Sequence, residues 1–490
     1  MTLDPRTPVL VGVGALTERP DDPAQACEPL EGMARAVEAA ARDAGSKALL
    51  EKIDSIWTPR GFWAYSDPGR LLAARFGADR ARTVVAEVGI LQTTILGRAA
   101  AAIAAGRSEV AVIVGGEARD RETRLRRQGL EAQRTEQSDS EPDEILRPHA
   151  EIMGRVEIEL GLVTPTIQYA MIDNALRFHE DQSLADHRAE LAALWGDFNR
   201  VAVANPRAWN REPRTGEEIV TPSDDNRLLA FPYTKSLVSQ WNVNQSGALV
   251  LCSLERARAL GLDPKRFVYP LCVVDSEHMV TLSERAEMHR APGFGLAGRR
   301  ALEHAGLALD DVAHLELYSC FPAAVRVQQR ELGLDRDRRA TQTGGMTFGG
   351  GPLNNFVIQS WVAMVERLRT DPGSHGLVTA VSGLLTKQGV SLLGPEPSRP
   401  FVHDFVTDEA REAWRTVACE REATGRARVS AYTVSTARDA ASGVILACDL
   451  DGGSRTLRVV ADEDLAATAM REELCGREVE LETGGGVRFL

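Results

Sequence analysis

Two stretches of this chain alternate short β-branched runs with alanine-rich runs, and this alternation limits its possible folds more than any other feature. The first stretch runs from PVLVGVGAL (8–16) through LQTTILGRAAAAIAAG (91–106) to EVAVIVGGEAR (109–119). The second runs from RFVYPLCVVDS (266–276) to HGLVTAVSGLL (375–385). Strands that alternate with helices predict an α/β fold with a mainly parallel sheet covered by helices.

The segment between the two stretches has a different texture. Residues 119–240 start polar and charge-mixed and continue as helices with scattered aromatic residues, which predicts an insertion over one end of the sheet. Three prolines make LLGPEPSRPF (392–401) a linker, and the short strands beyond it predict a small β-rich domain, which an OB-like barrel would fit. The predicted units are 1–265, which contains the insertion, then 266–396, and then 402–490.

Net charge and cysteine usage exclude several classes of function. A net charge of −13 argues against a protein that coats nucleic acid or an anionic membrane. Seven scattered cysteines form no Cys-x-x-Cys pair, so we predict neither a metal site nor a disulfide framework. The apolar run after residue 8 is too short to span a bilayer and follows no charged leader, so we expect a cytoplasmic protein without a membrane span.

The stretch ATQTGGMTFGGGPLNN (340–355) is the most unusual local motif. Five glycines within it allow sharp turns and close approach of a ligand to the backbone: Gly344, Gly345, Gly349, Gly350 and Gly351. Apart from Thr347, however, the run from Gly344 to Pro352 has no side chain suited to acid, base or nucleophilic chemistry. The motif therefore predicts a binding loop without its own catalyst.

Four segments in order resemble the thiolase superfamily over roughly residues 8–395. They are AAAAIAAGRSEVAVIVGGEAR, SGALVLCSLERARALGL, GLAGRRALEHAGLALDDVAHLELYSCF and TGGMTFGGGPL. YSCFP, TKQG and the β-rich tail look most like the actinobacterial thiolase-like proteins of type 1, which are related to sterol-carrier-protein thiolases and have an added carboxyl-terminal domain. The resemblance implies two like halves stacked as α-β-α-β-α, with a loop domain over the site.

Compared with a thiolase, the chain lacks the central catalytic groups. The nucleophilic cysteine of the family falls near Gly89 to Gln92, where this sequence has none, and Thr93 and Thr94 have no apparent base beside them. The oxyanion histidine of the G-H-P box aligns with Gly351, and the second cysteine of many thiolases aligns with Val381. Ordinary Claisen chemistry is therefore not expected.

Two residues of YSCF are the predicted catalytic candidates. Cys320 matches the second cysteine of the H-D-C-F box in sterol-carrier-type thiolases, although a buried small hydrophobe is the alternative. Tyr318 replaces the histidine or asparagine of that box and can donate a hydrogen bond, although packing at a strand end is the alternative. The resemblance includes thiolase-fold steroid aldolases that use tyrosines near these boxes.

Further residues are predicted to bind substrate, and three functions follow. The binding candidates are Gln245, Ser246 and Gly247, which match a segment that contacts pantetheine in thiolases, with Gly350, Gly351 and Lys387. The chain could bind coenzyme A or acyl-CoA without Claisen chemistry, as a ligand and not as a permanent cofactor. It could instead cleave a C–C bond in a CoA thioester by retro-aldol chemistry, or act as a scaffold whose carboxyl-terminal domain binds a partner protein or single-stranded nucleic acid. Thiolases usually form homodimers, and nucleic acid is disfavoured as a partner by the acidic charge.

Overall fold

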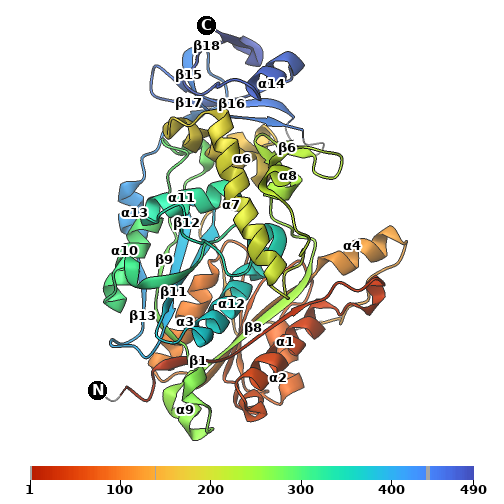
Figure 1. The fold of residues 1–490 in the computed structure, drawn as a ribbon, viewed down its shortest axis with the longest axis vertical. Helices are drawn as coiled ribbons and strands as arrows, with labels where there is room; N and C mark the ends of the chain where they lie inside the picture. The colour runs from red at the N-terminus through yellow and green to blue at the C-terminus, as the bar shows by residue number, and fades with distance from the viewer. Residues whose placement is uncertain (1–2, 138–139, 437–441) are drawn as a thin grey trace.

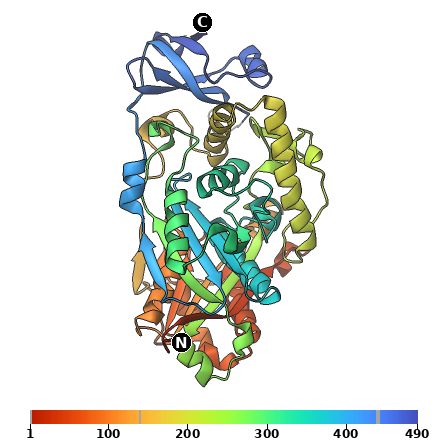
Figure 2. The same cartoon turned by 60° about the vertical axis from the view of Figure 1, so that its left-hand side comes forward.

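The computed structural model describes residues 3–137, 140–436 and 442–490, and these residues form three β-sheets (Figure 1). The predicted insertion includes residues 138–139, which lie outside the described ranges. Two of the sheets are stacked with helices between them, and the third lies at the carboxyl-terminal end of the molecule. The two ends of the chain lie near opposite ends of the long axis, as the turned view also shows (Figure 2).

The first sheet comes from the first β/α stretch. In spatial order its strands are β1 (Pro8–Thr17), β8 (Asn244–Ser253), β4 (Val110–Ala118), β2 (Ser55–Pro59), β3 (Arg82–Ala86) and β5 (Glu144–Leu146). Helices α1 (Pro29–Asp43) and α2 (Pro68–Phe76) cover its outer face, and α9 (Leu254–Ala259) follows β8. Gly12 and Gly14 let α1 approach β1, since a Cβ there would lie 2.1 and 2.3 Å from α1 carbonyl oxygens.

The second sheet comes from the second stretch. In spatial order its strands are β10 (Val312–Glu316), β11 (His375–Ser382), β12 (Lys387–Gly394), β9 (Tyr269–Ser276) and β13 (Val402–Phe405). Strand β12 takes Leu392 and Leu393, both fully buried, out of the segment expected to be a linker. Strand β13 is the first strand of the predicted 402–490 unit, but it pairs with β9 of the second sheet. The boundaries of the three units stay a prediction.

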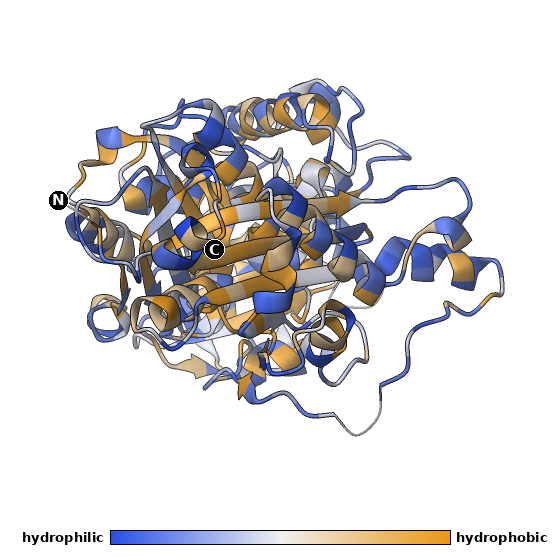
Figure 3. Ribbon diagram, turned by 90° about the horizontal axis from the view of Figure 1, so that it is seen from below, coloured by the Kyte–Doolittle hydropathy of each residue, from blue (hydrophilic) through white to orange (hydrophobic). Residues whose placement is uncertain are grey.

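Two helices fill the space between these sheets. Helix α3 (Gln92–Ala104) contacts β9, β4 and β8, and α12 (Phe356–Thr370) contacts β11 and β8, while α10 (Gly293–Ala305) covers the outer face of the second sheet beside α11 (Pro322–Leu332). This order of layers is the α-β-α-β-α stack that the resemblance implies. The sheet strands are mainly apolar between helices of mixed polarity (Figure 3). No helix within the described ranges is both long and apolar enough to cross a bilayer.

The insertion adds strands to the first and the third sheet and does not lie only over one end of the first sheet. Its elements are α4 (Arg119–Arg127), β5, α5 (Arg155–Glu159), α6 (Pro165–His179), α7 (Leu184–Ala204), α8 (Gly216–Val220), β6 (Leu228–Ala230) and β7 (Tyr233–Thr234). Helix α4 projects from the body of the molecule as an arm, and α7 lies on its surface at about mid-height (Figure 1). Strand β5 joins the first sheet, whereas β6 joins the third.

The third sheet belongs to the carboxyl-terminal region, which α13 (Thr407–Ala413) precedes. Its strands are β14 (Cys419–Glu420), β17 (Arg455–Val460), β16 (Gly443–Leu450), β15 (Gly425–Ser435), β18 (Glu478–Leu481) and β19 (Val487–Phe489), with α14 (Glu463–Ala469) beside them. Asn174 of α6 donates to the Tyr432 carbonyl at 2.9 Å, and Arg177 of α6 forms an ion pair with Glu473. The insertion and the third sheet are therefore fastened together.

Candidate functional site

The amino end of α3 lies where the resemblance places a thiolase nucleophile. Leu91 occupies the cap position and has no side-chain acceptor, and no acceptor for the backbone N–H of Gln92 or Thr93 is found in the described parts of the chain. All three residues are buried. A buried and uncapped helix end presents partial positive charge, which favours an anionic or carbonyl oxygen.

A buried carboxylate holds the two threonines at this end. Thr93 and Thr94 donate from Oγ1 to Asp275 of β9, at 2.5 and 2.8 Å, and Nε2 of His403 lies 3.0 Å from the same carboxylate. Sequence reasoning found no base beside these threonines and missed Asp275, although an acid that ends an apolar strand was a visible signal. The hydroxyls point at the carboxylate and not at the imidazole, so the group is not a nucleophile–base–carboxylate relay.

The glycine loop is anchored by another buried carboxylate, Glu316 at the end of β10. It accepts from the backbone N–H groups of Gln342 and Thr343 and from the hydroxyls of Thr341 and Thr343. Burial raises the pKa of Glu316 to about 7, although these hydrogen bonds act in the opposite direction. The entry to the loop is therefore held by a carboxylate whose charge is poorly solvated.

Backbone contacts fix the rest of the glycine loop. Gly350 has φ +107°, and a Cβ there would lie 2.2 Å from Oε1 of Gln245, so this position requires glycine. Thr347, the only hydroxyl among its central residues, accepts from Nε1 of Trp195 at 3.1 Å. Gly351 donates its N–H to the Gln240 carbonyl at 2.8 Å. These contacts hold the loop in one buried conformation.

The YSCF box lies beside this loop. Ser239 donates its N–H to the Cys320 carbonyl, and the next residue, Gln240, accepts from Gly351, so one short segment joins both boxes. The ring of Tyr318 meets Phe356 edge-on at 5.8 Å between centroids. Burial raises the pKa of Tyr318 well above its usual range and that of Cys320 to about 12. Neither side chain is ionised at neutral pH here.

The sequence did not indicate Tyr169, which lies on α6 and reaches the Cys320 thiol. Its ring stacks on Phe321 at 4.5 Å, and its hydroxyl lowers the pKa of Cys320 less than burial raises it. Burial also raises the pKa of Tyr169 well above its usual range. Tyr169 and Cys320 therefore form a neutral hydroxyl–thiol pair, suited to donating hydrogen bonds.

The predicted pantetheine segment presents its residues on two faces of β8. Gln245 donates to the Gly349 carbonyl at 2.8 Å, and Gly247 faces α12, where a Cβ would lie 3.0 Å from Nε2 of Gln359. Ser246 points the other way, toward α1, because its Oγ lies 2.5 Å from a Cβ placed on Gly32. The structure thus brings Gln245 and Gly247 to the glycine-loop side, and Ser246 only through its backbone.

The space between α3, the glycine loop and α12 collects buried amides. Nε2 of Gln92 donates to Oδ1 of Asn354 at 2.5 Å. Several other amide atoms here are buried without a partner in the described residues, namely Oε1 of Gln92, Nδ2 of Asn354, both amide atoms of Asn355 and Oε1 of Gln245. Buried polar atoms normally find partners, so this concentration marks a place suited to water or a polar ligand.

Lys387 completes the same region from β12. Its Nζ donates to the Gly89 carbonyl at 3.1 Å, and the residue is 4% exposed. Burial lowers the pKa of Lys387. The structure therefore joins Lys387 to the α3 end, whereas the backbone of Cys320 is linked to the glycine loop through Ser239 and Gln240.

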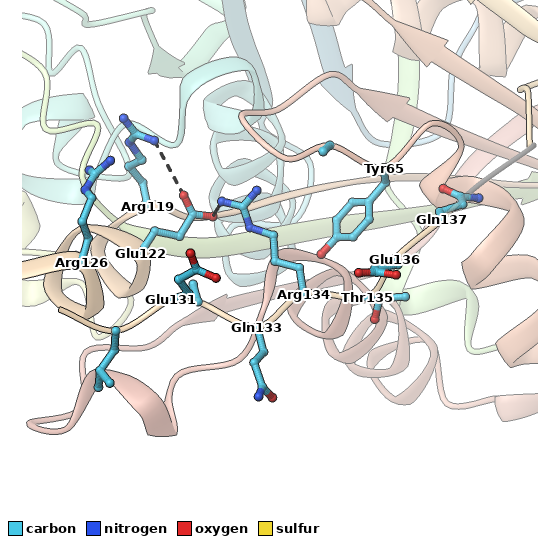
Figure 4. A pocket seen from close by; sticks show the side chains of 13 residues that line it. Tyr65, Arg119, Glu122, Arg126, Glu131, Gln133, Arg134, Thr135, Glu136 and Gln137 are labelled. Carbon is cyan, nitrogen blue, oxygen red and sulfur yellow. Dashed lines mark ion pairs between the residues drawn. The ribbon is translucent and has the colours of Figure 1, made fainter. Parts of the chain in front are cut away.

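A surface hollow of about 1300 Å³ lies elsewhere, at the arm formed by α4 and residues 128–137 (Figure 4). Arg119 and Arg134 point into it, and both pair with Glu122, at 3.7 and 2.8 Å (Figure 4). None of the predicted site residues lines this hollow. Because Arg119 and Arg134 already pair with a carboxylate, we do not assign the central chemistry to this hollow.

Comparison with known proteins places the chain among thiolase relatives. No protein-family model matches it. It is 29% identical over 228 residues to a steroid side-chain-cleaving aldolase from Thermomonospora curvata, covering 40% of this chain and 56% of the aldolase. It is 30% identical over 150 residues to a 3-ketoacyl-CoA thiolase from Chromohalobacter salexigens, covering 30% of this chain and 35% of the thiolase. The chain thus matches about half, and about one third, of these curated relatives.

A solved structure extends the similarity to the whole chain. A monomeric SCP2-thiolase-like protein of type 1 from Mycobacterium smegmatis is 31% identical, with a TM-score of 0.84, and the match covers 100% of both chains. The predicted α/β thiolase fold with an additional β-rich region is thereby confirmed. The chain belongs to the thiolase superfamily, among the SCP2-thiolase-like proteins of type 1.

Proposed function

We propose that this protein binds coenzyme A thioesters between the α3 amino end and the glycine loop, without forming a cysteine acyl-enzyme. The observation that carries this proposal is the position of Thr93 and Thr94, whose hydroxyls donate to Asp275 where a thiolase needs its nucleophile. The uncapped α3 end and the unpartnered amides around it offer a thioester oxygen and amide groups places to bind. Gln245, Gly247, Gly350, Gly351 and Lys387 are the proposed contacts, and Ser246 contributes through its backbone.

Thermal unfolding with added ligands tests this proposal. A ligand that binds only the folded protein raises the unfolding midpoint, so acetyl-CoA and free CoA should do so in a concentration-dependent way. A single-stranded oligonucleotide serves as the acidic control and should give no shift. If neither acetyl-CoA nor free CoA shifts the unfolding midpoint, the proposal is refuted.

Retro-aldol cleavage of a CoA thioester is the second candidate, and the match to the steroid side-chain-cleaving aldolase favours it. In this reaction Tyr318 and Cys320 would act as neutral hydrogen-bond or proton donors, since the pKa of each is raised by burial. The test uses 3-hydroxy-3-methylbutanoyl-CoA, which retro-aldol cleavage converts to acetone and acetyl-CoA. Acetone release that Tyr318→Phe abolishes without lowering the unfolding midpoint would support this candidate, and full activity of that variant would contradict the role of Tyr318.

A further inference from the structure

Lysine is rare in this chain, and one lysine stands apart from the others. Of 57 lysine and arginine residues only five are lysines, namely Lys47, Lys52, Lys235, Lys265 and Lys387. The first four are exposed, whereas Lys387 is 4% exposed. A chain that uses arginine almost everywhere thus keeps lysine at a buried central position. The two side chains differ there in one decisive property, because an amine can lose its proton near neutral pH and a guanidinium cannot.

The surroundings of Lys387 disfavour its charged form. Its one hydrogen bond runs to the Gly89 carbonyl, and no carboxylate lies within ion-pair distance of Nζ in the described parts of the chain. Glu277 is the acid that acts on it electrostatically, but its carboxylate lies 3.9 Å from Nε2 of His149. A buried ammonium without a carboxylate partner is costly, and burial accordingly lowers the pKa of Lys387.

The position of the amine adds to this effect. Gly89 lies three residues before α3 begins, so Nζ is held at the positive end of the helix, where a second positive charge is repelled. On the same helix end, Oε1 of Gln92 is buried without a partner, and its Nε2 contacts Asn354 of the glycine loop. The α3 end therefore contacts the Lys387 amine through Gly89 and the glycine loop through Gln92, and its first N–H groups are buried without an acceptor in the described residues.

We propose that Lys387 is the proton carrier of this site, acting on a 3-hydroxyacyl thioester, an inference that rests on the retro-aldol candidate. The neutral amine takes the proton of the C3 hydroxyl, and the C2–C3 bond breaks as the C3–O bond becomes a carbonyl. The electron pair of that bond passes to C2 and gives the thioester enolate, whose oxygen accepts from the N–H groups at the α3 end. The ammonium of Lys387 then returns its proton to C2, so that a ketone and a shortened acyl-CoA leave.

The first test measures the proton on each lysine directly. Protein that carries lysine labelled with ¹³C at Cε gives five signals, and the signal that disappears in Lys387→Arg belongs to Lys387. We expect the Lys387 signal to titrate at clearly lower pH than the four exposed lysines, and to move when acetyl-CoA is added. Titration together with the exposed lysines would overturn the proposal.

Ligand binding separates this inference from the acyl-CoA binding on which the retro-aldol candidate, and with it the role of Lys387, depends. If acetyl-CoA raises the unfolding midpoint but leaves the Lys387 signal unmoved, the acyl-CoA proposal stands and the role of Lys387 fails. If acetyl-CoA gives no midpoint shift, the acyl-CoA proposal itself fails, and the role of Lys387 falls with it.

Turnover provides the second test, with 3-hydroxy-3-methylbutanoyl-CoA as the probe. Lys387→Arg keeps a positive charge that cannot be released, and Lys387→Met keeps the length without a basic group, so both should lower acetone release by about 100-fold or more. Lys265→Met removes an exposed lysine and should change nothing. Both Lys387 variants should still unfold in one cooperative transition, which separates a loss of turnover from a loss of the fold. Activity of Lys387→Met within threefold of the parent would overturn the proposal.

Discussion

Replacing Thr93 by valine tests the carboxylate cluster at the α3 end most directly. Valine keeps the β-branched shape and nearly the same helix propensity, so the main change is the loss of one hydroxyl. That hydroxyl is fully buried and lies 2.5 Å from Oδ1 of Asp275. A hydrogen bond to a charged group contributes about 1.5–3 kcal/mol, which sets the expected loss in the free energy of unfolding. In an Asp275→Asn background the acceptor is neutral, so the loss should fall to about 0.5–1.5 kcal/mol.

Urea denaturation of the four proteins in this double-mutant cycle measures both quantities. Thr370→Val is the matched control, because its hydroxyl contacts the Arg367 carbonyl at an exposed site, and the change should stay within about 0.5 kcal/mol. Equal losses for Thr93→Val in both backgrounds would refute the charged hydrogen bond. A loss below about 0.5 kcal/mol in the parent background would show that Asp275 does not hold the α3 end.

Three further outcomes follow from the glycine loop and its anchor. Gly350→Ala should lower the unfolding midpoint and the shift given by acetyl-CoA, because φ is +107° and the added Cβ would meet Gln245. Gly129→Ala is the control: its φ is +74° and its Cβ would meet nothing, so it measures the cost of a positive φ without a steric clash. Between pH 4.5 and about 7 the folded state keeps a proton on Glu316 that the unfolded chain has lost. As pH rises through this window, the free energy of unfolding should therefore fall more for the parent than for Glu316→Gln. Parallel plots of the free energy of unfolding against pH would contradict the raised pKa. Gly351→His should produce no acetoacetyl-CoA cleavage above background, and robust cleavage would mean that a nucleophile exists at the α3 end.

The fold could be predicted further than the site. Periodicity located the strands and helices of both β/α stretches, because each element has a local pattern of burial. Strand β12 was not predicted because prolines follow directly after Gly394 in its segment. The division of the insertion between two sheets was not predicted because pairing partners such as Ala230 and Ser435 lie far apart in sequence. The missing cysteine near Gly89 was visible by alignment alone. The two charged groups that contact this end, Asp275 of β9 and Lys387 of β12, reach it from other strands, and no local pattern gives such distances.

The attachment of the third sheet bears on the scaffold alternative. In that alternative this region would bind a partner protein, so its attachment to the rest of the chain matters. Here the insertion supplies β6 to the sheet, and Asn174 and Arg177 of α6 bind its strands and the segment near Glu473. The same helix α6 carries Tyr169, which touches the Cys320 thiol. Helix α6 therefore links the third sheet directly to the YSCF box.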